Sequence, residues 1–154
     1  MRCVVGLVLL LLHLVPHGYP NACENSFLKI KYNDNVTEIA VEIADTYSKR
    51  KKGLMFRDSL DLHSGMLFVY DNPGKVGFWM KNTLIPLDVA FADARGHVVR
   101  IVRDTEPLSR DLIYGGEDIQ FVLEINAGLS KEMNLFEGSE LLHPRINKHI
   151  AQSC

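Results

Sequence analysis

The sequence predicts a mainly β protein, either an antiparallel β-sandwich or a partly closed barrel, with one or two short helices. About seven or eight short segments alternate apolar with polar residues or are rich in Val, Ile and aromatic residues, as in small all-β domains. Turn-forming residues separate them, and no helical segment is long enough for the repeated crossovers of a parallel sheet. The 154 residues, 47% hydrophobic and 23% charged, suit one domain with a single core.

The first two predicted strands form a hairpin. Residues 28–32 and 39–44 each alternate apolar with polar side chains, and Asn33-Asp34-Asn35 provides turn residues between them. We therefore expect one face of this hairpin to be buried and the other to be solvated.

A short helix is predicted directly after the hairpin. Asp45 is suited to the N-cap position, residues 46–52 form the helix, and Gly53 suits the position after its last turn. The run Lys49-Arg50-Lys51-Lys52 lies at the negative end of the helix dipole. This placement explains the basic run as a structural feature, without a phosphate- or membrane-binding role.

The remaining elements are predicted to be strands with turns and loops between them. Apolar runs and alternation indicate strands, and clusters of Asp, Asn, Pro and Gly indicate turns. We expect strands at residues 65–70, 76–82, 87–92, 97–103, 119–125 and 139–142, turns at 71–74 and 93–96, a loop at 104–118 and a second helix near 129–134.

The N-terminal residues 1–22 are predicted to be a secretory signal segment. Arg2 precedes an apolar run, residues 4–15, which is short for a membrane span, and Pro and Gly residues follow it. The alternative is a buried N-terminal helix. We therefore expect an exported protein, periplasmic or envelope-associated, that contacts a membrane only through this segment or a lipid.

Two cysteines remain if the signal segment is removed. Cys23 follows Ala22, as in a lipoprotein processing site, so it is a lipidation candidate; it could instead form a disulfide with Cys154. The expected organisation is an N-terminal extension and first strand at 23–35, a β domain at 36–142 and a loosely ordered C-terminal tail at 143–154.

Several sequence blocks resemble domain-of-unknown-function family 192, in its order and spacing, over roughly residues 36–142. The resemblance implies a small, mostly exported prokaryotic domain with a β-sandwich-like core. It implies no agreed activity, no cofactor and no catalytic residues. The blocks are Asp45-Thr46, Gly53-Leu54-Met55-Phe56-Arg57, Gly65-Met66-Leu67-Phe68, Phe78-Trp79-Met80-Lys81-Asn82-Thr83, Pro86-Leu87-Asp88, Gly96 and Val122-Leu123-Glu124-Ile125-Asn126-Ala127-Gly128.

Residues 77–88 mix aromatic and polar side chains more densely than any other segment and contain the only Trp of the chain. If this part is extended, Trp79 and Lys81 project to one face and Asn82 to the other. A bend before Asp88 would bring its carboxylate beside Lys81 or Asn82.

Two interpretations of these residues are open. In the first, Trp79 stacks on a small ligand in a cleft, and the neighbouring polar side chains bind the ligand's polar groups. In the second, the residues are structural: Asp88 accepts hydrogen bonds from backbone amides, Asn82 stabilises the bend, and Lys81 extends to solvent.

Arg57 is the remaining candidate. It could bind a carboxylate or phosphate with two hydrogen bonds, or it could pair with a neighbouring acid, Asp58, Asp61 or Asp88. The candidate ligand-binding residues are therefore Arg57, Trp79, Lys81, Asn82 and Asp88.

The sequence gives little support for a metal or a cofactor. Met55, Met66 and Met80 with His63 could in principle bind Cu(I), but the three Met residues occupy apolar positions where Met is ordinary core filler. The histidines lack zinc-ligand spacing, and there is no Gly-rich phosphate loop. We expect neither a metal nor a cofactor.

The expected function is a noncatalytic ligand-binding or accessory module of the cell envelope, with a small-molecule or envelope ligand. The net charge of −2 argues against nucleic-acid binding, and hydrolase signatures such as Gly-x-Ser-x-Gly are missing. One alternative is an enzyme that acts on envelope carbohydrate through paired carboxylates, Asp88 with Glu124 or Asp118. Another is a protein-interaction module with an exposed aromatic edge.

Overall fold

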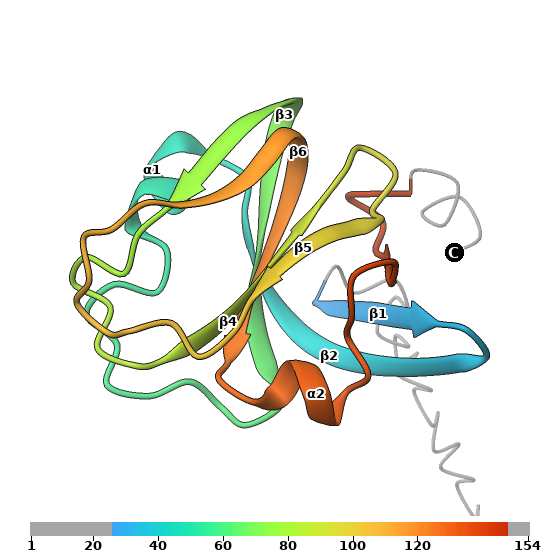
Figure 1. Cartoon of the computed structure of the whole chain (residues 1–154), viewed down its shortest axis with the longest axis horizontal. Coiled ribbons are helices and arrows are strands. Elements are labelled where there is room, and N and C mark those ends of the chain that lie inside the picture. The colour runs from blue at the N-terminus through green and yellow to red at the C-terminus, as the bar shows by residue number, and fades with distance from the viewer. Residues whose placement is uncertain (1–25, 148–154) are drawn as a thin grey trace, which may run out of the picture.

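The fold is a single seven-stranded sheet that curls into a half-barrel, seen in a computed structural model that describes residues 26–147 (Figure 1). The strand order is β5-β4-β6-β3-β2-β1-β7. The elements are β1 (Phe27–Tyr32), β2 (Asn35–Ala44), α1 (Tyr47–Lys52), β3 (Ser64–Phe78), β4 (Leu87–Ala92), β5 (Val98–Val102), β6 (Ile113–Asn126), α2 (Leu129–Glu132) and β7 (Glu140–Leu142). The predicted mainly β class, with a partly closed barrel and two short helices, is confirmed.

All but one of the strand pairs are antiparallel. The exception is β2 with β3, where Val41 pairs with Gly65 and Ala44 with Phe68 in parallel register. Parallel neighbours need a crossover connection, and residues 45–63, which include α1, provide it. The sequence did not predict this pair, because its alternation describes strands and not the direction in which they pair.

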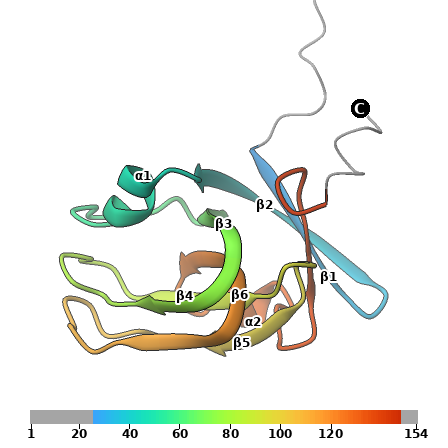
Figure 2. The same ribbon diagram turned by 90° about the horizontal axis from the view of Figure 1, so that it is seen from above.

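The strands β3 and β6 are longer than predicted, and they include residues that were expected to form a turn and a loop. The turn expected at 71–74 lies inside β3, and the end of the loop expected at 104–118 belongs to β6. The β3–β6 register shifts between Val69 and Gly77, so Pro and Gly residues are accommodated as irregularities and not as a reversal. The bent strands give the sheet its curl (Figure 2).

The two outer strands of the sheet meet. His97, which precedes β5, forms an isolated antiparallel bridge with Glu140 of β7. The amide of Val98 donates to the carbonyl of Ser139 at 2.8 Å, and the amide of Leu141 donates to the carbonyl of Gly96 at 2.8 Å. These bonds draw β5 and β7 together and hold the half-barrel in its curled shape.

The curled sheet buries apolar side chains on both faces. One cluster lies mainly between β1, β2, β5, β6 and α2, and the other lies under α1 and the crossover. Every residue of β4 is buried, because this strand separates the two clusters. No helix within residues 26–147 has the length and apolar composition that crossing a membrane requires.

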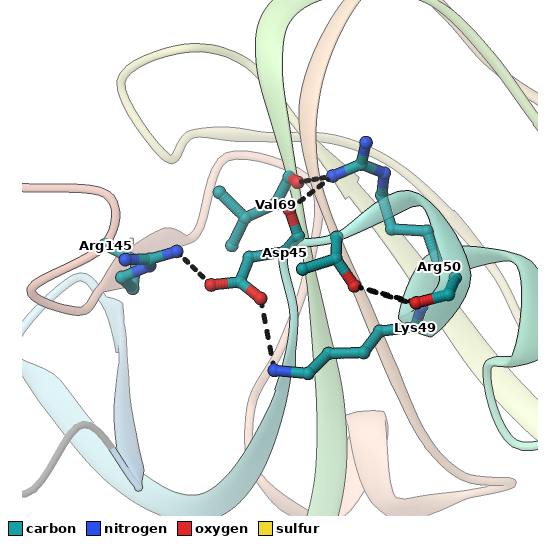
Figure 3. Close-up of polar contacts among 7 residues, drawn as sticks. Asp45, Lys49, Arg50, Val69 and Arg145 are labelled. Atoms are coloured by element: carbon teal, nitrogen blue, oxygen red, sulfur yellow. Dashed lines mark hydrogen bonds and ion pairs between the residues drawn. The ribbon is translucent and has the colours of Figure 1, made fainter.

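Helix α1 is tied to the sheet at its start. Thr46, and not the predicted Asp45, is the N-cap and accepts from the amide of Lys49, while Gly53 ends the helix with φ 48°. The carboxylate of Asp45 instead lies between Lys49 and Arg145 (Figure 3).

The segment that follows β7 packs on the sheet as far as residue 147. His143 is buried, Ile146 packs against the first core cluster, and Arg145 contacts Asp45. This part of the C-terminal segment is therefore anchored to the start of α1. The cysteine predictions at Cys23 and Cys154 and the signal segment lie outside the described residues.

Candidate functional site

A cavity of about 400 Å³ lies between α1, the start of the crossover, and the long strands β3 and β6. The crossover helix faces the bent part of these strands in both ribbon views (Figures 1 and 2). The parallel β2–β3 connection thus forms one side of the cavity. The lining residues are Tyr47, Arg50, Lys51, Lys52, Gly53, Leu54, Met55, Phe68, Tyr70, Gly77, Phe78, Trp79, Thr83, Leu112 and Glu124. We call this cavity the α1 pocket.

Aromatic side chains form the wall of the α1 pocket on the β3 side. The rings of Phe68 and Phe78 meet edge to face with centroids 4.8 Å apart, and Phe78 makes a similar contact with Phe91 at 5.8 Å. Trp79 follows directly and remains 45% exposed. A row of buried and partly buried aromatic rings therefore leads to a half-exposed indole at the pocket.

A buried acid, Glu124 of β6, also lines the α1 pocket. Its neighbours in register are Met66 on β3 and Val89 on β4, both buried apolar residues on the same face. Glu124 is 5% exposed, and its Oε2 has no hydrogen-bond partner among the described residues. Burial raises the pKa of the Glu124 carboxyl to about 8, so at neutral pH the group is mainly protonated.

Arg50 of α1 connects the helix to the pocket wall. Its Nη1 donates to the carbonyls of Asp45 and Val69, each at 2.8 Å (Figure 3). The guanidinium carbon lies 5.0 Å from the centroid of the Tyr70 ring. Burial raises the pKa of the Tyr70 phenol, the Arg50 charge lowers it, and Glu124, once ionised, raises it.

Trp79 and Lys81 lie together, although neither of them belongs to a strand. The ammonium of Lys81 is 5.3 Å from the centroid of the indole. The extended conformation predicted for this part ends earlier, because β3 stops at Phe78 and a turn follows. Asn82 has φ 60° in this turn, and its carbonyl accepts from the amide of Phe56 at 2.8 Å. Asn82 therefore holds the crossover beside the turn.

Asp88 lies apart from Trp79 and Lys81 and has a structural environment. Its carboxylate is buried and accepts hydrogen bonds from three backbone amides, those of Asp104, Gly128 and Ser130, at 2.9, 3.0 and 3.1 Å. The second interpretation of Asp88 anticipated backbone amides, and they come from the segment after β5 and from the start of α2. Asp88 does not line the α1 pocket.

Arg57 lies in a second cavity of about 410 Å³ that shares no lining residue with the α1 pocket. It pairs with Glu42 and not with the three acids considered from the sequence: Nη1–Oε1 is 2.5 Å and Nη2–Oε2 is 2.8 Å. The hydrogen bond to Arg57 lowers the pKa of Glu42, and the hydrogen bond to Glu42 raises the pKa of Arg57. The structure thus separates Arg57 and Asp88 from Trp79.

The carboxylates that were considered as a catalytic pair do not share a site. Asp88 pairs in register with Ile125, while Glu124 pairs with Val89, so the two acids point to opposite faces of the sheet. Asp118 is exposed and is six residues from Glu124 on the same strand. Within residues 26–147 no group of three or more His, Cys, Asp or Glu residues is arranged to hold a metal ion.

Sequence reasoning did not assign Glu124, Tyr70 and Arg50 to the same pocket as Trp79. A signal for Glu124 exists, because it interrupts the apolar run from Phe121 to Ile125, where an acid is rare unless it has a role. Arg50 and Tyr70 carried no such signal, since their positions depend on the parallel crossover.

The chain belongs to the class of mainly β half-barrel proteins, here with a pocket between the crossover helix and the two long strands. The chain is a member of the DUF192 family, described as Uncharacterized ACR, whose family model matches residues 28–143. The match includes β1 as well as the rest of the sheet.

The fold is similar to those of several solved structures, including the following two. A candidate transcription regulator from Sinorhizobium meliloti 1021 is 32% identical, with a TM-score of 0.75 over 77% of this chain and 93% of that chain. A protein of unknown function from Novosphingobium aromaticivorans DSM 12444 is 30% identical, with a TM-score of 0.72 over 75% of this chain and 83% of that chain. No curated protein matches the chain.

Proposed function

We propose that this protein is a noncatalytic small-molecule-binding module of the cell envelope and that the α1 pocket is its ligand site. The observation that carries the proposal is a buried carboxyl group without a partner for Oε2, in a cavity of about 400 Å³ with a half-exposed Trp at its side. Ligand pockets commonly combine apolar walls with a few convergent polar groups. The assignment to the envelope is supported by the N-terminal sequence described above.

The geometry of the α1 pocket favours a small-molecule binding site over a carbohydrate-active enzyme or a protein-interaction module. Glu124 is the one carboxyl group among the described residues that line the α1 pocket, whereas glycoside hydrolysis commonly uses two. A protein-docking surface would be flat, whereas Trp79 lies at the side of a concave cavity. The pocket therefore suits a small ligand that is partly enclosed by the protein.

A thermal-shift screen of small organic molecules on the full-length protein tests this function. A ligand at about one hundred times its Kd stabilises the folded state by about 2.7 kcal/mol, which raises the Tm by roughly 5–10 °C for a chain of this size. We expect Trp79→Ala to reduce the shift strongly, because the indole forms part of the pocket wall.

Phe27→Ala is the matched control for this screen. Phe27 is an aromatic residue of β1 with 48% exposure, close to the 45% of Trp79, and it does not line the α1 pocket. The control should retain the full ligand-induced shift. A ligand whose effect is the same in wild type and Trp79→Ala would remove the α1 pocket as its site, and a screen without any hit would contradict the proposed function.

A further inference from the structure

We propose that the α1 pocket binds a small aromatic carboxylate, with the ligand's carboxylate group held by the Arg50 guanidinium, the Tyr70 phenol and the Glu124 carboxyl. The aromatic body of the ligand lies against Trp79 and Phe78. This inference rests on the proposed function, because it assigns a ligand class to the same pocket.

The charge of the pocket lining favours an anion. Arg50, Lys51 and Lys52 contribute three positive charges, and Glu124 is the one acidic residue among the described lining residues. Within residues 26–147 none of the three cations forms an ion pair with a carboxylate. The lining therefore carries positive charge that an anionic ligand would neutralise, while a cationic ligand would be repelled.

Arg50 is held in an orientation suited to a carboxylate. Nη1 is fixed by the carbonyls of Asp45 and Val69 (Figure 3). The guanidinium lies over the Tyr70 ring. Nη2 and Nε of Arg50 have no hydrogen-bond partner in the described part of the chain. A guanidinium that is anchored at one nitrogen and has further N–H groups available can bind a carboxylate with little loss of side-chain entropy.

Glu124 supplies the second polar contact. It is 5% exposed, lines the pocket, and has no partner for Oε2. Because burial raises the pKa of this carboxyl to about 8, it carries a proton at neutral pH and can donate its O–H to the ligand's carboxylate. The ionised form of Glu124 would repel the same ligand, so binding is coupled to this proton.

The groups that face Glu124 leave this coupling intact. The residues paired with Glu124 on the two neighbouring strands, Met66 and Val89, are apolar. One strand further, Glu42 of β2 pairs with Met66, but its carboxylate forms an ion pair with Arg57. Burial raises the pKa of Tyr70, so its phenol remains a hydrogen-bond donor as pH increases toward 9. The titratable residues that share the pocket with Glu124 are Tyr47, Arg50, Lys51, Lys52 and Tyr70.

The walls of the pocket favour an aromatic body for the ligand. Phe68 and Phe78 present rings fixed by edge-to-face contacts, and Trp79 offers half-exposed indole surface beside them. Rings in such surroundings bind other rings in stacked or edge-to-face arrangements worth about 0.5–1.5 kcal/mol each beyond the buried area.

Calorimetric titration of the full-length protein with benzoate, benzamide and benzylamine tests the ligand class, because the three probes share one ring and differ in charge. At about pH 6.5 we expect benzoate to bind at least about tenfold more tightly than benzamide, and benzylamine to bind most weakly. Between about pH 7 and pH 9 the affinity for benzoate should fall about tenfold, because Glu124 ionises in this range.

Two sets of variants separate the proposed contacts from general effects. Glu124→Gln retains an N–H donor of the same shape, so it should bind benzoate at about pH 6.5 and lose the fall in affinity at higher pH. The double variant Lys51→Gln, Lys52→Gln should bind benzoate several-fold more weakly. Lys29→Gln, Lys31→Gln makes the same change in charge at two exposed residues of β1 and should leave the affinity unchanged.

The possible results distinguish the inference from the proposed function. The ligand class is overturned if benzamide or benzylamine binds as tightly as benzoate, or if the affinity for benzoate does not change with pH. If Trp79→Ala abolishes the observed binding, the pocket remains the ligand site. No detectable benzoate binding also overturns the ligand class, and the compound screen then decides the proposed function. Benzoate binding that is unaffected by Trp79→Ala overturns both.

Discussion

At the scale of single residues, two buried acids on neighbouring strands have opposite environments. Asp88 accepts three backbone hydrogen bonds, while Oε2 of Glu124 has no partner in the described part of the chain. Backbone donors satisfy the oxygens of the first acid, whereas a carboxyl surrounded by apolar side chains, as in Glu124, is stabilised when protonated. The first acid therefore organises loops, and the second one is available to a ligand.

The protonation of Glu124 predicts how stability changes with pH. Its pKa is raised in the folded state from the ordinary value of 4.5 to about 8, so the folded state retains a proton that the unfolded state releases. This contribution to stability is complete below about pH 4.5, decreases as pH rises, and is lost above about pH 8. Glu124→Gln should match wild type near pH 5 and exceed it by up to a few kcal/mol near pH 9.

Denaturant unfolding of both proteins at the two pH values measures this effect. Glu117→Gln, at an exposed glutamate of the same strand, is the control and should follow wild type at both pH values. If the difference in unfolding free energy between Glu124→Gln and wild type is the same at both pH values, Glu124 does not carry a proton in the folded state near neutral pH.

The sequence identified part of the candidate site at this scale. Trp79 is conspicuous as a single indole among polar residues, and it lines the α1 pocket, whereas Lys81 does not. The two side chains meet beyond the end of β3, so strand alternation does not explain their contact. The structure separates Asp88 and Arg57 from Trp79. Sequence could not show this, because it does not reveal which loops supply the amides to Asp88 or which strand supplies Glu42 to Arg57. The α1 pocket depends on long-range contacts that local patterns do not encode.

At the scale of elements, β3 joins the pocket to the parallel crossover. Gly65 of β3 lies close against β6: a Cβ at this position would lie 2.6 Å from the carbonyl oxygen of Glu124 and 2.8 Å from Cγ2 of Ile125. The backbone oxygen cannot move without a shift of β6. A glycine is therefore required by close packing of two strands and not by a turn.

Gly65→Ala should consequently destabilise the protein by about 2–4 kcal/mol, because β3 and β6 must separate to admit a methyl group. Gly74→Ala is the matched control on the same strand: a Cβ at this position would have nothing within 4 Å, so the change should be within about 1 kcal/mol of neutral. Equilibrium unfolding in urea compares the two variants, and equal stabilities would contradict the close approach of β3 and β6.

Local sequence patterns predict the positions of most strands. The exceptions are β3 and β6, which extend beyond the predicted strands because they pair with each other. The hairpin of β1 and β2 and the strand β4 follow from alternation and turn residues. The Asp-Asn-Pro-Gly segment inside β3 has turn chemistry, but the long partner β6 holds it in an irregular strand. Tertiary pairing therefore overrides the local preference where two strands are long enough to bend together.

At the scale of the whole molecule, the sheet is held in shape where its two ends meet. Gly96 has φ +87°, and a Cβ at this residue would lie 2.6 Å from the carbonyl oxygen of Leu141 and 2.8 Å from Cγ2 of Ile146. Gly138 has a similar φ of +92° with nothing within 4 Å. The two glycines thus share a backbone requirement and differ in how closely another segment approaches.

Gly96→Ala should destabilise the protein by about 1–3 kcal/mol more than Gly138→Ala, since both variants have the same positive-φ strain and only the first has a clash. Hydrogen exchange provides a local measurement. The amides of Val98 and Leu141 bond across the junction between β5 and β7, so both should lose protection in Gly96→Ala and retain it in Gly138→Ala. Retained protection in both variants would show that the junction tolerates the methyl group.

The junction between β5 and β7 also affects how the molecule behaves beside other copies of itself. Open sheets present rows of unpaired N–H and C=O groups that can recruit a strand from another chain, a common route to aggregation. Here backbone groups next to the two terminal strands bond one another and are not available to a foreign strand. The contact between the two ends of the sheet thereby reduces the edge that a strand from another chain could join.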